Sequence, residues 1–159
     1  MQYWKRFEYR IVGHLRKLGW HAHRVPVSGA ASVIKGDVIA SRNGVRLRID
    51  AKSTASKDHI RINVEDIEKN ARISGNEEVP LVVFSFRRHH RLYGIILPRY
   101  ARLFARQRRA SLRSERSIAI RKEDVCGLGD SDCIMLQLAN GKQYAVAELD
   151  AILRKLHRI

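Results

Sequence analysis

The chain has 159 residues, 45% of them hydrophobic, which suffices for one folded domain with a real core and excludes a chain that is disordered as a whole. Lys and Arg number 31 against 16 Asp and Glu, and the resulting net charge of +15 indicates a polyanionic partner, with nucleic acid as the first candidate. Two cysteines are too few for a disulfide framework, and the sequence has no apolar run of membrane-spanning length and no export signal, so we expect an intracellular protein of the cytoplasm, in the nucleoid or, if the source is viral, in the host cytoplasm.

Residues 3–19 are predicted to form an amphipathic helix that stops at Gly19. Glu8 falls inside its apolar stripe, where a carboxylate needs a cationic partner or a bound metal ion. Two interpretations stay open, a salt-bridged Glu at the edge of the stripe and a metal ligand. The apolar positions at helical spacing are Trp4, Phe7, Ile11, Leu15 and Leu18.

Residues 21–27 alternate weakly and predict a first strand, on which His21 and His23 share one face. Two histidines with no third ligand nearby favour surface side chains over a zinc site. The small residues 28–32, beginning with Ser28, predict a flexible loop that can close over a phosphate.

Residues 37–52 predict a β-hairpin that turns at Asn43-Gly44, the dipeptide that most favours a two-residue type I′ turn. Such a turn fixes the register and sets Val38 opposite Ile49. One step further along both strands, the register sets Asp37 opposite Asp50.

Asp37 and Asp50 therefore face each other across the predicted hairpin, and like charges so placed are destabilising unless a cation neutralises them. Lys52 lies two residues after Asp50 and so shares its face. Carboxylates without softer ligands suit Mg²⁺, or Mn²⁺ as the alternative, and such an ion beside an amine fits phosphodiester hydrolysis. The competing interpretation is an ordinary wet strand face on which Asp50 pairs weakly with Arg48 or Lys52.

Further along, residues 64–74 predict a helix, and residues 81–86 and 92–97 predict strands on either side of a basic turn at 87–91. Ten Arg and no Lys occur from Arg87 to Arg116. Because guanidinium groups bind phosphate bidentately, this bias favours contact with a nucleic-acid backbone over a merely solvated surface. The helical spacing after Pro98 predicts one Arg face, formed by Arg99, Arg102, Arg106 and Arg109.

The tail predicts a strand around 118–120, a second hairpin turning at Asn140-Gly141 between 133–138 and 143–147, and a final helix over 148–157. Residues 107–117 are the one candidate linker. Cys126 and Cys133 are expected to be reduced and buried.

Together these motifs resemble those of the PD-(D/E)xK nuclease superfamily and, more narrowly, of the archaeal-type (Hjc-like) Holliday junction resolvases. The matching segments are Glu8 in RFEYRIVGHLRKLGW, Arg24 and Ser28-Gly29 in HAHRVPVSG, Asp37 in KGDVIA, and Asp50 and Lys52 in LRIDAKST. The resemblance covers about the first 105 residues. Gly36 stands where that family has Pro, Asp50 where it has Glu, and Tyr9 where it usually has Arg.

The resemblance implies a homodimeric, Mg²⁺-dependent enzyme that cuts two opposed strands of a four-way DNA junction and leaves 5′-phosphate ends. Glu8, Asp37 and Asp50 would hold the metal, Lys52 would assist the water or the transition state, and Ser28 would act from its loop. The candidate DNA-binding residues are Arg6, Arg10, Arg24, Lys35, Lys57, Arg87, Arg88, Arg91, Arg99 and Arg102.

The expected fold is α/β, a restriction-endonuclease-like mixed central sheet flanked by helices, with a nuclease core at 1–105 and a hairpin-plus-helix extension at 106–159 packed on the same domain. Two other functions stay open. One is a restriction-like or nicking endonuclease on other DNA structures, and the other is a non-catalytic basic protein that binds nucleic acid.

Overall fold

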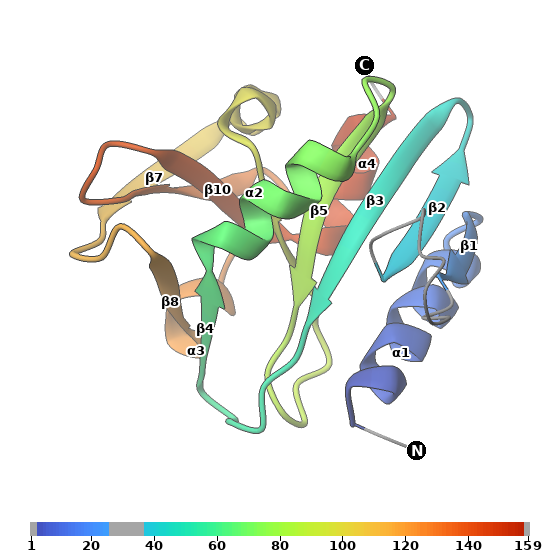
Figure 1. Cartoon of the computed structure of the whole chain (residues 1–159), viewed down its shortest axis with the longest axis horizontal. Coiled ribbons are helices and arrows are strands. Elements are labelled where there is room, and N and C mark those ends of the chain that lie inside the picture. Colours follow the sequence, from blue (N-terminus) through green and yellow to red (C-terminus); the bar gives the residue numbers. More distant parts are fainter. Residues whose placement is uncertain (1–2, 26–36, 158–159) are drawn as a thin grey trace.

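The computed structural model describes residues 3–25 and 37–157. Eight strands form one mixed sheet in the order β1-β2-β3-β5-β6-β10-β9-β7 (Figure 1). Their bounds are β1 His21–Arg24, β2 Val38–Arg42, β3 Val45–Lys52, β5 Glu78–Phe84, β6 Tyr93–Ile96, β7 Arg106–Ser111, β9 Asp132–Gln137 and β10 Gln143–Glu148.

A second, two-stranded sheet pairs a strand from the first half of the chain with one from the second half, antiparallel. The helices lie on both faces of the main sheet, with α2 crossing one face and α4 on the other (Figure 1). These elements are β4 His59–Asn63, β8 Ser117–Arg121, α1 Tyr3–Lys17, α2 Val64–Ile73, α3 Lys122–Val125, α4 Leu149–Leu156 and the 3₁₀ helix η2 Pro98–Leu103. The predicted mixed α/β sheet flanked by helices is confirmed.

The β2–β3 hairpin has the predicted register, with Val38 opposite Ile49 and Arg42 opposite Val45. Asn43 and Gly44 both have positive φ, 48° and 82°, which a type I′ turn requires. The β9–β10 hairpin likewise turns at Gly141, whose φ is 89°. In both hairpins the turn dipeptide in the sequence was a sufficient signal.

Two apolar cores lie on opposite faces of the main sheet. One packs α1 and α4 against alternate residues of the central strands, among them Leu47, Ile49 and Leu81. The other packs α2 and the β4–β8 sheet against the remaining positions, including Val82 and Phe84. Residues of β3 that alternate with Leu47 and Ile49 thus point toward α2, and Asp50 and Lys52 are among them.

Three expectations about the second half of the chain were wrong. The helical Arg face does not form, because η2 ends at Leu103 and Arg106 to Ser111 is a strand that pairs in parallel with β9. Residues 107–117 are not a linker, since most of β7 falls within them. Cys126 is exposed, although Cys133 is buried and both are free thiols.

None of the described helices is long and apolar enough to cross a membrane.

Candidate active site

The β2–β3 hairpin brings two carboxylates together beside the end of β3. Asp37 precedes β2, and its backbone N–H donates to the carbonyl of Ile49 at 3.0 Å. Its Oδ2 accepts the backbone N–H of Ala51 at 2.8 Å. These bonds hold the Asp37 side chain against β3, where the carboxyl of Asp50 is hydrogen-bonded to it. The predicted juxtaposition of Asp37 and Asp50 is therefore present in the fold.

Asp50 has a strongly perturbed carboxyl group. Burial, the hydrogen bond to Asp37 and the charges of Asp37 and Asp66 raise its pKa to about 7, against the opposing charge of Lys52. Two carboxylates in contact do not both ionise readily unless a positive charge joins them. Without a metal ion, the pair therefore retains a proton near neutral pH.

Lys52 lies between two carboxylates. Its Nζ is 2.9 Å from Oδ2 of Asp66 and 3.5 Å from Oδ2 of Asp50. Burial alone would lower the pKa of this amine, but Asp50 and Asp66 outweigh burial and raise it. The amine is thus a cation beside the Asp37–Asp50 pair, as the shared strand face predicted.

Sequence reasoning missed Asp66, which lies in the first turn of α2. The residue was visible as an acidic side chain at the start of a predicted helix. Nothing in the sequence spacing indicated that α2 would cross the sheet and bring it to Lys52.

Glu8 is buried, with only 5% of its surface exposed, and its Oε1 accepts a hydrogen bond from Nε of Arg24 at 2.8 Å. Burial raises the pKa of this carboxyl, as does the charge of Asp37, while Arg24 acts in the opposite direction. The guanidinium of Arg24 also lies over the ring of Tyr9, 4.7 Å from its centroid. Glu8 thus has the salt bridge that one interpretation required, and it is close enough to Asp37 to affect its own ionisation.

The donor set fits a hard divalent cation. Within residues 3–25 and 37–157, no three His, Cys, Asp or Glu side chains lie close enough together to form a metal-binding group, so Glu8 does not complete one with Asp37 and Asp50 in this conformation. Mg²⁺, however, is usually held by one or two carboxylates together with waters and substrate phosphate. The paired carboxyls of Asp37 and Asp50, sharing a proton that a cation could replace, are such a donor set.

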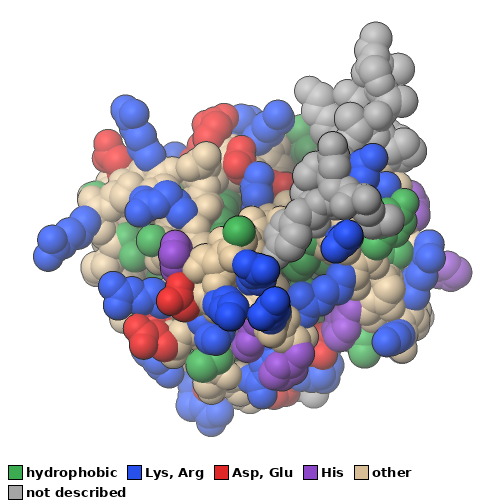
Figure 2. Space-filling view, turned by 90° about the horizontal axis from the view of Figure 1, so that it is seen from below, with side chains coloured by type: hydrophobic (Ala, Val, Ile, Leu, Met, Phe, Trp, Pro, Cys, Tyr) green, Lys and Arg blue, Asp and Glu red, His purple; other side chains and the backbone are tan. Residues whose placement is uncertain are grey.

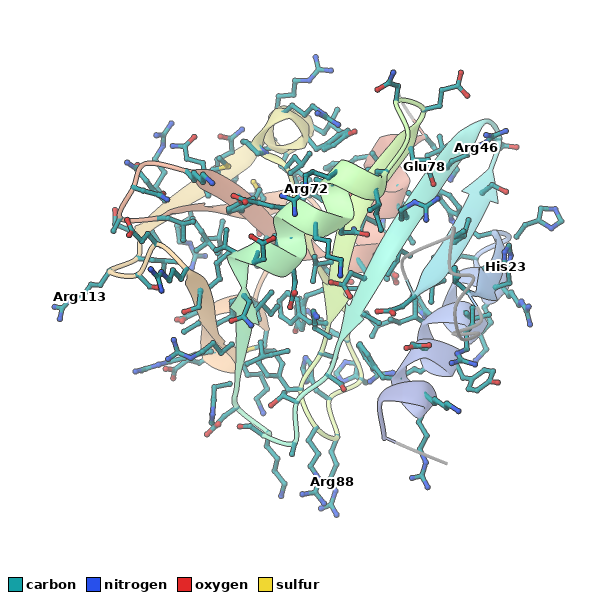
Figure 3. All side chains as sticks on the ribbon, viewed as in Figure 1. His23, Arg46, Arg72, Glu78, Arg88 and Arg113 are labelled. Carbon is teal, nitrogen blue, oxygen red and sulfur yellow. The ribbon has the colours of Figure 1, made fainter. Side chains whose placement is uncertain are left out.

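The candidate DNA-binding residues divide between two ends of the sheet. Lys57 and the pair Arg87 and Arg88 are exposed on the loops that follow the parallel strands β3 and β5, where Lys52 also lies. The backbone N–H of Arg87 donates to the carbonyl of Ser56 at 2.9 Å and joins the two loops. Figure 2 views the molecule from this end and shows Lys and Arg side chains gathered around the middle of the face, and Figure 3 shows Arg88 projecting from it.

Two further candidates lie on α1, whose first turn is at the same end of the molecule (Figure 1). Arg6 is exposed, and Nη2 of Arg10 donates to the carbonyl of His89 at 2.8 Å. Arg91 reaches toward the carbonyl of Cys126 and the carboxylate of Glu148.

Arg99 and Arg102 lie at the other end of the sheet. Both belong to η2, which follows the antiparallel strand β6, and Arg99 lines a hollow with Gly75 and Asn76, just before β5 begins. Arg24 is largely engaged by Glu8. The candidates Ser28 and Lys35 lie outside the described residues.

Residues 3–130 match the family of archaeal Holliday junction resolvases (Hjc). The chain belongs to this family. The motifs of the first helix and the hairpin had predicted that membership, which is now confirmed.

A crossover junction endodeoxyribonuclease of Sulfolobus islandicus rod-shaped virus 1 is 40% identical over 65 residues, which are 41% of this chain and 53% of the viral protein. The chain thus spans about half the length of this curated relative. The solved structure of Archaeoglobus fulgidus Hjc, a Holliday junction resolvase from an archaeal hyperthermophile, aligns with a TM-score of 0.54 over 75% of this chain and 88% of the other, at 18% identity. It shows a shared fold and confirms the predicted restriction-endonuclease-like architecture.

Proposed function

We propose that this protein is a metal-dependent endodeoxyribonuclease that resolves four-way DNA junctions. The observation that carries the proposal is the Asp37–Asp50 carboxyl pair with the amine of Lys52 beside it, in a chain of the Hjc family. The viral relative named for crossover junction cleavage supports the same substrate class.

In this proposal Asp37 and Asp50 hold Mg²⁺, or Mn²⁺, and Glu8 joins them when DNA is bound. When bound, the ion supplies a water of lowered pKa and a Lewis acid for the scissile phosphate. The two carboxylates bind the cation in place of the proton that they share without it. Arg24 favours the ionised form of the buried Glu8 carboxyl and orients it through its 2.8 Å hydrogen bond.

Lys52 is the cationic group that the protein itself contributes to the reaction. Its side chain is 31% exposed, and its amine stands beside the carboxylates, where it can donate to a phosphate oxygen or to the attacking water. Negative charge grows on the phosphate oxygens in the transition state, and a fixed ammonium stabilises that charge.

Paired cuts in opposed strands require two catalytic centres. Among the described residues the Asp37–Asp50–Lys52 arrangement occurs once in the chain. We therefore propose a homodimer that presents two such centres to one junction. Light scattering during size-exclusion chromatography should give twice the mass of 18.3 kDa, and a monomer at all concentrations would contradict the dimer.

The deciding experiment compares cleavage of a four-way junction, a replication fork, a flap and linear duplex, each with Mg²⁺, with Mn²⁺ and with chelator. We expect symmetric incisions in the junction that leave 5′-phosphates, dependent on the metal, and far slower cutting of linear duplex. Equal cutting of linear duplex would favour a restriction-like or nicking enzyme. Binding without any metal-dependent cutting would favour a non-catalytic nucleic-acid-binding protein.

A further inference from the structure

Asp66 is in direct contact with the amine of Lys52 at 2.9 Å, closer than Asp50 at 3.5 Å. It is none of the catalytic or metal-binding candidates that the sequence predicted. It lies on α2, on the far side of the amine from the hairpin that supplies Asp37, Asp50 and Lys52.

The position of Asp66 relative to β3 is fixed by the packing of its helix. Val64 and Ile67, on either side of it in the sequence, are buried in the core between α2 and the sheet. One turn on, Nδ2 of the buried Asn70 donates to the carbonyls of Arg48 at 3.2 Å and Leu81 at 3.1 Å, and so ties α2 to both β3 and β5. The carboxylate of Asp66 therefore meets the Lys52 amine from a rigid support.

We propose that Asp66 is a positioning residue that draws the Lys52 ammonium away from Asp50 and so leaves the Asp50 carboxylate available to a metal ion. The inference rests on the proposed function and adds to it a fourth acidic residue with a separate task. An ammonium and a metal cation compete for the same carboxylate oxygens, because both bind there through their positive charge. With Asp66 as the nearer partner of the ammonium, the cation meets less competition. The amine also stays at a defined place beside the phosphate.

The test measures Mn²⁺ binding in the absence of DNA, by the loss of the electron paramagnetic resonance signal of free Mn²⁺. Asp66→Ala should raise the dissociation constant for Mn²⁺ about tenfold or more, within the range that loss of a residue supporting a metal ligand produces. Asp66→Glu, which restores a carboxylate on the same helix turn, should recover most of the affinity. Asp66→Asn provides a second variant of almost unchanged size, and thermal melts verify that each variant is folded.

Glu65→Ala is the matched control. Glu65 is the adjacent acidic residue of the same helix turn, and its side chain is 72% exposed and pairs with Arg72 at 3.0 Å. Its removal changes the net charge of the protein and the charge at the helix terminus by the same amount as removal of Asp66. We expect its Mn²⁺ affinity to equal that of the unaltered protein. An equal loss of affinity in the Glu65 variant would reduce the Asp66 effect to general electrostatics and overturn the proposal.

A double-mutant cycle with Lys52→Ala decides how Asp66 acts. If Asp66 works by engaging the amine, Asp66→Ala should change Mn²⁺ affinity by less than about twofold once Lys52 is absent. The same weakening in both backgrounds would make Asp66 a metal ligand or a source of negative field, and no weakening in either would make the contact inert. Each of these two results overturns the proposal.

The experiment also separates this inference from the function on which it rests. If the unaltered protein neither binds Mn²⁺ nor cuts a junction, the proposed function fails and the positioning role falls with it. If the unaltered protein does both while Asp66→Ala matches it in Mn²⁺ affinity, the nuclease assignment stands and only the role of Asp66 is refuted.

Discussion

At the scale of single residues, the proposed chemistry depends on how a proton and a cation compete for Asp50. Burial and two neighbouring carboxylates act in the same direction on this group and raise its pKa to about 7, while Lys52 opposes them. A carboxyl group in this state does not ionise readily on its own, but it can ionise when a divalent cation binds to it. Metal affinity should therefore increase as the pH rises toward 7, because binding displaces the shared proton.

The same shift makes the stability of the metal-free protein depend on pH. Between the unfolded pKa of 3.8 and the folded pKa of about 7, the folded state binds more protons than the unfolded state, so the free energy of unfolding falls as the pH rises through this window. Asp50→Asn removes this titrating carboxyl. Between pH 4 and pH 7 the free energy of unfolding of the variant should therefore rise by on the order of 2–4 kcal/mol relative to that of the unaltered protein. Urea unfolding of both proteins across the window, in chelator, measures the difference. Parallel pH profiles would contradict the shared proton.

Loss of Asp37 or Lys52 should separate cutting from binding. Asp37→Asn removes a proposed metal ligand and Lys52→Ala removes the fixed ammonium, and either change should slow single-turnover cleavage by about 10²- to 10³-fold or more. The junction dissociation constant should change by less than about threefold, because affinity resides mainly in contacts between Arg or Lys and phosphates. Fluorescence anisotropy in chelator gives that constant. A parallel loss of binding and cutting would show that these residues hold the fold or the DNA instead.

The sequence predicted those features of the site that are set by local geometry, within one hairpin or one helix. The pairing of Asp37 with Asp50 follows from one turn and the period of a strand, and the need of Glu8 for a partner follows from its place in an apolar stripe. That the partner is Arg24, and that Lys52 also contacts Asp66, depends on how α1 and α2 pack on the sheet. No spacing in the sequence encodes that packing.

At the scale of elements, the two hairpins and the arginine segment show which signals suffice. Asn43-Gly44 and Asn140-Gly141 mark their turns locally, because Asn43, Gly44 and Gly141 have positive φ, which suits Asn and Gly and few other residues. The spacing of the arginines after Pro98 places no comparable constraint on the backbone conformation. Residues 106–111 become a strand because β9, much later in the chain, offers them a partner.

The hairpin that carries the candidate site should be sensitive to its turn. Gly44 has a φ of 82°, so Gly44→Ala strains the backbone and should lower the free energy of unfolding by about 1–2 kcal/mol. Gly13 offers a control with the opposite sign. It lies within α1 with nothing within 4 Å of an added Cβ, so Gly13→Ala should stabilise the protein by about 0.5–1 kcal/mol. Urea unfolding measures both, and equal effects would show that the turn geometry is not limiting.

At the scale of the whole molecule, the positive charge is distributed unevenly with respect to the candidate site. The loops after β3 and β5 carry Lys57, Arg87 and Arg88 at the end of the sheet where Lys52 lies. Arg99 and Arg102 occupy the far end. A duplex whose scissile phosphate reaches Asp37 and Asp50 passes the first group directly, and it reaches the second only if the DNA extends across the molecule.

The salt dependence of junction binding distinguishes these two ends. Each phosphate contact contributes about 0.9 to the slope of log affinity against log salt concentration. We expect Arg87→Ala with Arg88→Ala to reduce the slope by about 1–2 and to weaken binding most at low salt, because these side chains lie at the end of the sheet that holds the candidate site. Arg99→Ala with Arg102→Ala carries the same loss of charge and should leave the slope nearly unchanged. Equal reductions of the slope would mean that junction arms contact both ends of the sheet. A reduction confined to the Arg99 and Arg102 variant would place the DNA away from Asp37, Asp50 and Lys52. That result would contradict the assignment of the catalytic centre.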